Sequence, residues 1–89
     1  MASSAGLTRA GAEVTVRYWA SARAAAGCDS ERFTGQRVGD VLATAAEAHA
    51  GLEVVLGVST ILLDGRPVAA SDELPQGAIL EVLPPFAGG

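Results

Sequence analysis

Hydrophobic and polar residues alternate with a period of two near the start of the chain. The five residues of this stretch are Val14, Thr15, Val16, Arg17 and Tyr18. Such alternation is typical of a half-buried β-strand, because successive side chains point to opposite faces of a sheet. The pattern therefore predicts a first strand near residues 13–19.

The stretch that follows has a weaker pattern. It is rich in Ala and Gly up to Gly27 and Cys28, and we expect a loop there. Residues 31–34 are predicted to form a short second strand, which would make residues 13–34 a loose hairpin.

The period changes to that of a helix over residues 38–50. Side chains suited to a buried stripe recur every three or four residues, at Val38, Val41, Leu42, Ala45, Ala46 and His49. Positions at this spacing share one face of an α-helix, so the pattern predicts one main helix. The side chains expected to face the core are Val41, Leu42 and Ala45.

The sequence marks the C-terminal end of this helix more clearly than its N-cap position. Asp40 suits the positive end of the helix dipole, and Gly51 is a good stop signal. The N-cap position falls on Gln36 or Arg37, and neither side chain caps a helix well. We therefore expect a frayed first turn.

The second half of the chain contains short β-rich runs. Residues 60–63 predict a strand, and Asp64-Gly65 favours the type I′ turn of a hairpin. Residues 66–69 would return as a short strand. Because Pro67 has no N–H to donate, this strand belongs at a sheet edge.

The last strand is predicted over residues 79–83, where Glu81 alone interrupts a run of apolar residues. The predicted order is therefore a hairpin, one helix and further short strands. One helix can cover one face of a small mixed sheet, with the first and last strands side by side in the middle. This is an α+β fold of the β-grasp (ubiquitin-like) class, and we assign it to residues 13–83.

The composition and net charge of the chain indicate which classes of partner it is suited to bind. The chain has 89 residues, enough for one domain with a modest core, and 49% of them are hydrophobic. Its net charge of −4 disfavours nucleic acid, whose phosphates would be repelled. An acidic surface suits a basic protein partner, and it is also common among soluble domains that have no such partner.

We expect the protein to be cytoplasmic. Cys28 is the only cysteine, so no intramolecular disulfide supports secretion. No stretch approaches the ~18 apolar residues of a membrane span, so no membrane association is expected, and the start of the chain lacks the apolar run of a signal peptide. Residues 1–12 are mostly small or polar and are predicted to be a disordered leader.

Few side chains suggest catalysis. Cys28 and His49 are the only conceivable nucleophile and base, and the sequence suggests no third group to orient them. We interpret both as structural or idle. The sequence shows no metal-ligand spacing and no phosphate-binding loop, so we expect no metal site.

The last six residues, 84–89, form a predicted C-terminal tail. Pro84-Pro85 is a stiff, polyproline-like spacer that would make the end project, and Phe86 can fill a pocket in a partner. Gly88-Gly89 has no Cβ atoms, so a narrow channel can enclose its backbone. We predict that other active sites receive this tail. The alternative is a frayed, glycine-rich terminus of a domain with another role.

The segment 81–89 (EVLPPFAGG) resembles the C-terminus of the MoaD/ThiS sulfur carriers, above all the small subunits of molybdopterin synthase. The resemblance continues over residues 14–23 (VTVRYWASAR), with Trp19 where the family usually has Phe. It also includes residues 38–42 (VGDVL) and 63–65 (LDG), and so covers almost all of the predicted domain and tail.

The resemblance implies a function for the tail. It implies that an ATP-dependent, ubiquitin-activating-like enzyme adenylates the Gly89 carboxylate, and that sulfur from a sulfur-donating enzyme then replaces AMP to give a thiocarboxylate. Pro85, Phe86, Ala87 and Gly88 would be inserted with it into partner active sites. The final partner would be the large subunit of molybdopterin synthase. The chain would then be a sulfur-donating subunit and co-substrate, not a catalyst alone, and would bind no cofactor, since ATP is used by the activating enzyme.

Three positions depart from the family pattern. Arg37 stands where Ser or Thr often caps the helix, and Ala78 stands where Asp is common. Both changes bear on local stability. Phe86 replaces a smaller apolar residue, which leaves the partner's pocket unassigned.

Other functions share this fold and tail. Carriers of sulfur for thiamin, cysteine or another sulfur-containing metabolite have the same Gly-Gly end, although the thiamin carriers lack the Pro-Pro pair. From a different class comes a ubiquitin-like modifier, which forms isopeptide bonds with lysines of target proteins. This chain has no lysine of its own. The third alternative is an interaction module whose end is never activated.

Overall fold

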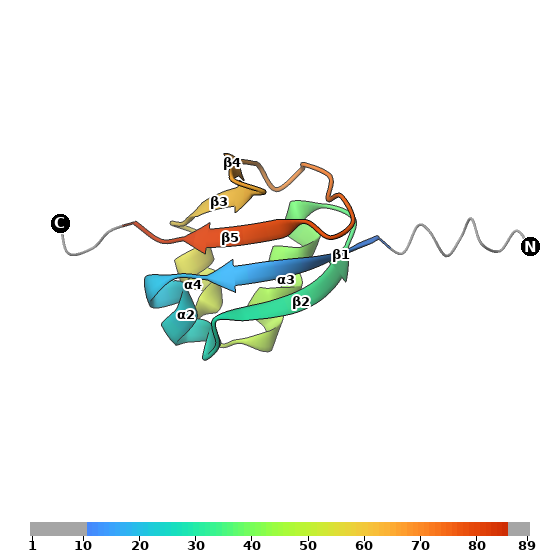
Figure 1. The fold of residues 1–89 in the computed structure, drawn as a ribbon. Helices are drawn as coiled ribbons and strands as arrows, with labels where there is room; N and C mark the ends of the chain where they lie inside the picture. The colour runs from blue at the N-terminus through green and yellow to red at the C-terminus, as the bar shows by residue number, and fades with distance from the viewer. Residues whose placement is uncertain (1–10, 86–89) are drawn as a thin grey trace, which may run out of the picture.

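The two central strands of the sheet come from opposite ends of the chain. The computed structural model describes residues 11–85 (Figure 1). Its elements are β1 (Ala12–Tyr18), α2 (Ala20–Ala26), β2 (Ser30–Gly35), α3 (Val38–Ala48), α4 (Leu52–Leu56), β3 (Thr60–Leu63), β4 (Arg66–Pro67) and β5 (Ile79–Leu83). The five strands form one mixed sheet in the order β2-β1-β5-β3-β4, and the helices lie against one of its faces.

The parallel pairing of β1 with β5 confirms the predicted β-grasp fold. Thr15 lies opposite Ile79, and Tyr18 lies opposite Val82. The strand β2 pairs antiparallel with β1, and β3 pairs antiparallel with β5. The first strand begins at Ala12, so the leader predicted over residues 1–12 lies outside the described residues except for its last two positions.

The core lies between the inner face of the sheet and the helices. It contains the buried residues Val14, Val16, Tyr18, Ala22, Val38, Val41, Ala45, Leu52, Leu80 and Val82, together with smaller contributions at its margin. Val41 and Ala45 face inward as predicted, whereas Leu42 is only partly buried. The longest helix is α3, as predicted, and it ends two residues early, at Ala48.

Two short helices were not predicted. The segment expected to be a loop before Gly27 is the helix α2, and that prediction is wrong. Its sequence, ASARAAA, has high helix propensity but no stripe of large apolar residues. Gly27 ends it in the left-handed conformation, with φ 76°. Gly51, predicted to stop the main helix, precedes the second short helix, α4, with φ 90°.

The predicted fraying of the first turn of α3 is also wrong, because a distant loop supplies the missing hydrogen-bond partners. The N–H groups of Val38 and Gly39 donate to the carbonyl oxygens of Asp72 and Ala70, both at 2.9 Å. The Arg37 guanidinium donates to a third carbonyl of the same loop at 2.8 Å. A Cβ on Gly39 would lie 3.1 Å from the Ala70 Cβ, so this close approach favours glycine.

The hairpin at the far edge of the sheet has the predicted turn. Asp64 and Gly65 both have positive φ, 48° and 88°, as a type I′ turn requires. The strand β4 occupies the sheet edge, as expected for a strand that contains Pro67, and it is shorter than the predicted 66–69. No helix within residues 11–85 is both long and apolar enough to cross a membrane.

Candidate functional site

The chain leaves the sheet immediately after β5. The Trp19 N–H donates to the Val82 carbonyl at 3.2 Å, close to the end of the pairing between β1 and β5. Pro84 is half-buried and Pro85 is exposed. Because neither proline has an N–H, the sheet ladder cannot continue through them. The structure therefore sets the base of the predicted tail at Leu83.

Most of the predicted site residues lie beyond this point. Gly89, Gly88, Ala87 and Phe86 are outside the described residues, so their predicted roles stay predictions. Pro85 is described, and its exposure leaves it accessible to a partner.

Basic and aromatic side chains lie beside the last residues of β5, where the tail begins. The Arg17 guanidinium lies 5.1 Å from the centroid of the Trp19 ring, and the Trp19 residue is 38% exposed. Arg23 forms an exposed ion pair with Asp29 at 3.5 Å. These residues, with Tyr18 and Ser30, line a hollow of about 230 Å³. Two arginines thus lie at this end of an otherwise acidic protein, in a place suited to an acidic group of a partner.

The outer face of the sheet combines apolar and charged side chains. Leu80 and Val82 point into the core, so the alternate residues Ile79 and Leu83 point outward. Leu62 of β3 lies on the same outer face, opposite Glu81. Ile79 is 40% exposed, and the helices cover only the other face. We call this surface, Leu62, Ile79, Glu81 and Leu83, the outer face; it is suited to contact with another protein.

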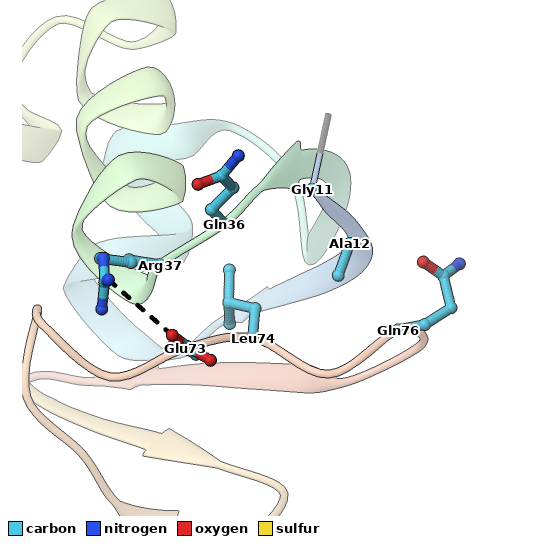
Figure 2. A pocket seen from close by; sticks show the side chains of 7 residues that line it. All are labelled: Gly11, Ala12, Gln36, Arg37, Glu73, Leu74 and Gln76. Atoms are coloured by element: carbon cyan, nitrogen blue, oxygen red, sulfur yellow. Dashed lines mark ion pairs between the residues drawn. The ribbon is translucent and has the colours of Figure 1, made fainter. Parts of the chain in front are cut away.

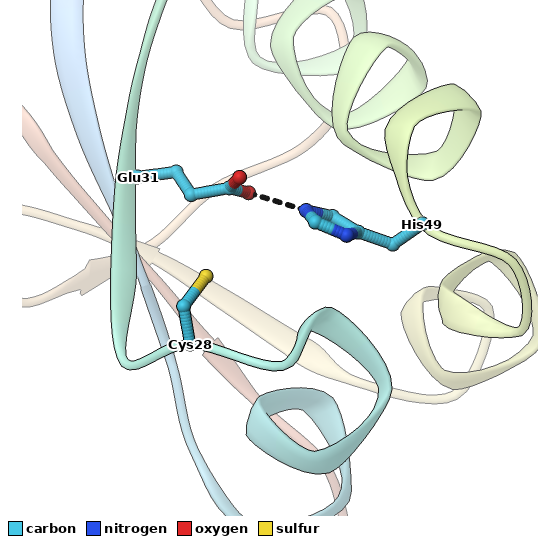
Figure 3. Close-up of side chains that lie close together, drawn as sticks. All are labelled: Cys28, Glu31 and His49. Atoms are coloured by element: carbon cyan, nitrogen blue, oxygen red, sulfur yellow. Dashed lines mark hydrogen bonds and ion pairs between the residues drawn. The ribbon is translucent and has the colours of Figure 1, made fainter.

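The structure also brings together three side chains that the sequence left apart. Cys28 follows α2, Glu31 is in β2 and His49 follows α3, and their ligand atoms all lie within 4.8 Å of one another (Figure 3). His49 Nε2 lies 2.7 Å from Glu31 Oε1. The expectation of no third group beside Cys28 and His49 is therefore wrong. Glu31 lies opposite the buried Val16 in the sheet, so its side chain points inward. A charged residue at an inward strand position was the sequence signal that could have indicated this cluster.

A tyrosine completes this polar cluster. The Tyr18 hydroxyl donates to Glu31 Oε1 at 2.8 Å. Burial, and then the hydrogen bond to the Glu31 carboxylate, raise the pKa of Tyr18 well above its ordinary value. Partial burial and the charges of Glu31 and Asp29 raise the pKa of the Cys28 thiol. Cys28 is thus a protonated thiol at neutral pH, which makes it a poor nucleophile.

A larger hollow, of about 400 Å³, lies at the opposite end of the sheet (Figure 2). It is lined by Gly11, Ala12, Gln36, Arg37, Glu73, Leu74 and Gln76. Two of these residues, Arg37 and Glu73, form an exposed ion pair at 3.8 Å. The hollow is remote from the base of the tail, and the one carboxylate among the described residues of its lining, that of Glu73, is already paired with Arg37.

Comparison with known proteins gives the family. The model of the ThiS family matches residues 16–89, from the middle of β1 through Gly89. The chain belongs to the ThiS family. It is thus a ubiquitin-like protein of the ThiS/MoaD sulfur-carrier type. No match was found among proteins of curated function.

Solved structures agree on the fold. The Pyrococcus furiosus protein described as molybdopterin converting factor subunit 1 is 28% identical, with a TM-score of 0.76 over 85% of this chain and 100% of that one. Small archaeal modifier protein 1 of Methanosarcina acetivorans is 27% identical, with a TM-score of 0.80 over 88% and 97%. A complex of subunits 1 and 2 of the Helicobacter pylori molybdopterin-converting factor contains a chain that is 23% identical. It has a TM-score of 0.65 over 86% and 99% and shows the shared fold alone.

Proposed function

We propose that this protein carries sulfur as a C-terminal thiocarboxylate on Gly89 and donates it in molybdopterin biosynthesis. The observation that carries the proposal is the extent of the family match, which includes the whole predicted tail and reaches Gly89. The described part of the chain supports it, since the sheet ends at Leu83 and two prolines follow. The folded domain would then be the part that partners bind, and the reacting carboxyl carbon would be that of Gly89.

The chemistry of the proposed cycle assigns catalysis to the partners. A carboxylate is a poor electrophile, so one Gly89 oxygen first attacks the α-phosphorus of ATP and pyrophosphate leaves. A sulfur nucleophile then attacks the acyl carbon of the adenylate, and AMP leaves. With a persulfide as the nucleophile, the product is an acyl disulfide. A thiol then cleaves its S–S bond, forms a disulfide with the donor's remaining sulfur and releases the thiocarboxylate. ATP belongs to the activating enzyme, and ATP-dependent activation is consistent with a role in the cytoplasm.

The proposed partners are proteins that hold the body while they act on the tail. The outer face offers Leu62, Ile79 and Leu83 for apolar contact, and Arg17 and Trp19 lie beside the tail. We assign these surfaces to the adenylating enzyme and then to the large subunit of a molybdopterin synthase. The Helicobacter pylori structure, a complex of two subunits, supports a protein partner of the second kind. A separate sulfur-donating enzyme acts between the two.

Pro84-Pro85 favours the molybdopterin pathway over thiamin synthesis, and the Pyrococcus furiosus relative supports this choice. A second function, protein modification, is favoured by the similarity to small archaeal modifier protein 1. Carriers for cysteine or another sulfur-containing metabolite would use the same carboxylate.

The test is reconstitution with a cognate activating enzyme, ATP and a sulfur donor. We expect pyrophosphate release and a mass increase equal to the exchange of one oxygen for sulfur. A chain that lacks Gly89 is the matched control, since its described fold is complete. Equal pyrophosphate release from both chains would disprove the proposal.

Addition of the large subunit and a pterin precursor should then consume the thiocarboxylate. Protein conjugates of higher mass in the native host would instead indicate the modifier function.

A further inference from the structure

The Cys28–Glu31–His49 cluster has the composition of a metal site. Thiolate, carboxylate and imidazole are all ligands of zinc, and three protein ligands with an open fourth position are a common arrangement. The three residues come from three separate segments, yet their ligand atoms all lie within 4.8 Å of one another and are partly buried (Figure 3). Figure 3 shows the Cys28 sulfur and the Glu31 and His49 side chains directed toward a common space.

We propose that Cys28, Glu31 and His49 bind a divalent cation of the zinc class. The fourth position would be taken by water. A thiolate and a carboxylate supply two negative charges and the imidazole is neutral, so the set balances one divalent ion. The site lies on the body of the protein, and this inference does not rest on the sulfur-carrier function.

The distances require only local adjustment. In a tetrahedral zinc site, ligand atoms lie about 2.0–2.3 Å from the metal and therefore about 3.3–3.6 Å from each other. Glu31 and His49, now 2.7 Å apart, would separate slightly to admit the ion. Cys28 lies in the short loop between α2 and β2, so its side chain can close the remaining distance.

Neighbouring contacts hold two of the ligands in place. Tyr18 is buried, and its hydroxyl donates to Glu31 at 2.8 Å, which fixes the carboxylate as an outer hydrogen bond does in many metal sites. The Tyr18 ring also meets the His49 ring edge-on, with centroids 6.3 Å apart. The backbone N–H of His49 donates to the Ala45 carbonyl at 3.2 Å and anchors the residue to the end of α3.

Binding has a defined proton balance. The Cys28 S–H bond breaks as the S–metal bond forms, and the thiol proton goes to solvent. His49 must present the lone pair of Nε2, so Nε2 loses the proton of its hydrogen bond to Glu31, and the neutral ring carries its proton on Nδ1. The hydrogen bond between His49 Nε2 and Glu31 is thereby replaced by two bonds to the same ion.

The experiment is titration of the full, untagged, reduced chain with Co²⁺ and Zn²⁺. The chain has one cysteine and one histidine, so a thiolate-to-cobalt charge-transfer band identifies Cys28 without ambiguity. We expect one equivalent of Co²⁺ to bind with this band and with tetrahedral visible absorption, and Zn²⁺ to displace it. Cys28→Ser should abolish the band. Glu31→Gln and His49→Gln should each weaken binding at least ~10-fold, since even loss of an outer hydrogen-bond partner costs ~10–100-fold.

Glu53→Gln is the matched control, because Glu53 is an exposed carboxylate on α4 and is not a member of the cluster. It should bind both metals as the native chain does. A second measurement needs no substitution: Zn²⁺ should slow alkylation of the native Cys28 thiol, and a chelator should restore the rate. Metal binding without the charge-transfer band, equal affinity in Cys28→Ser, or an alkylation rate unaffected by Zn²⁺ would each overturn the proposal.

Discussion

The inner and outer faces of the sheet are made by alternate residues of the same strands and differ in almost every property. Leu80 and Val82 have no exposed surface, whereas Ile79, next to Leu80, is 40% exposed. The inner face packs against the helices, and the outer face is open. The comparison teaches that core packing and the proposed partner contact fall on alternate positions, so one property can be changed while the other is kept.

The largest effect is expected from a change on the inner face. Leu80→Ala leaves a cavity in the core and should lower the free energy of unfolding by about 2–5 kcal/mol. Ile79→Ala, one residue away, should cost about 1 kcal/mol or less, mainly through β-propensity. Urea unfolding followed by circular dichroism measures both values. Equal losses for the two variants would show that the faces do not divide the roles as argued.

A change in the tail should reduce thiocarboxylate formation and leave the stability of the fold unchanged. Gly88→Val adds a branched side chain where the proposed channel must enclose backbone, and misplacement of a reacting group by about 1 Å can cost ~100-fold in rate. We expect thiocarboxylate formation with the activating enzyme to fall by about that factor. The urea midpoint should not change, because the described helices and strands end at Leu83. Normal thiocarboxylate formation by this variant would show that no narrow channel of a partner encloses the backbone of residue 88.

A smaller effect is expected on the outer face. Ile79→Ser removes apolar contact area and should weaken binding of the activating enzyme about 10-fold, or 1.4 kcal/mol. Val54→Ser is the matched control, because Val54 is 76% exposed but lies on α4, on the side of the helices. Isothermal titration calorimetry with the activating enzyme compares the two. A larger loss for Val54→Ser would assign docking to the helical side instead.

An effect that is absent at neutral pH concerns Tyr18, the one tyrosine, which joins the inner face to the polar cluster. Its pKa is raised in the folded state, so its contribution to stability is complete below pH ~10 and is lost as pH rises above that value. In a Cys28→Ser background, the unfolding free energy should fall by up to about 1.4 kcal/mol per pH unit above pH ~10. Tyr18→Phe should remove this slope. The chain has no lysine to add a competing titration, and an unchanged slope in Tyr18→Phe would contradict the assignment.

Elements with a clear period were predictable from the sequence. The alternation in β1, the helical stripe of α3 and the Asp64-Gly65 turn are local signals, and the structure confirms each of them. The helix α2 was missed because alanine carries no amphipathic pattern, even though Ala22 and Ala26 are buried. The first turn of α3 was misjudged because its partners, in the loop at residues 70–72, are far away in sequence.

The tail and the Cys28–Glu31–His49 cluster also differ in whether their residues are neighbours in the sequence. The tail could be proposed from the sequence because its chemistry depends on consecutive residues. The ThiS family model covers these residues, and their individual roles stay predictions. The Cys28–Glu31–His49 cluster could not, because its members meet only when a loop, a strand and a helix end are packed together. No spacing rule connects residues 3 and 18 positions apart on different elements.

The pairing of β1 with β5 also determines when the domain can fold during synthesis. The central strand β5 is the last of the described elements to be made, and without it the core lacks Leu80 and Val82, two of its fully buried side chains. Formation of such long-range contacts waits until both partners have been translated. A chain that has folded has therefore been translated at least to Leu83, within six residues of Gly89. We expect ribosomal products that stop earlier to stay unfolded and open to proteolysis, so the proposed activating enzyme, by recognising the folded domain, would seldom bind a chain that ends before Leu83.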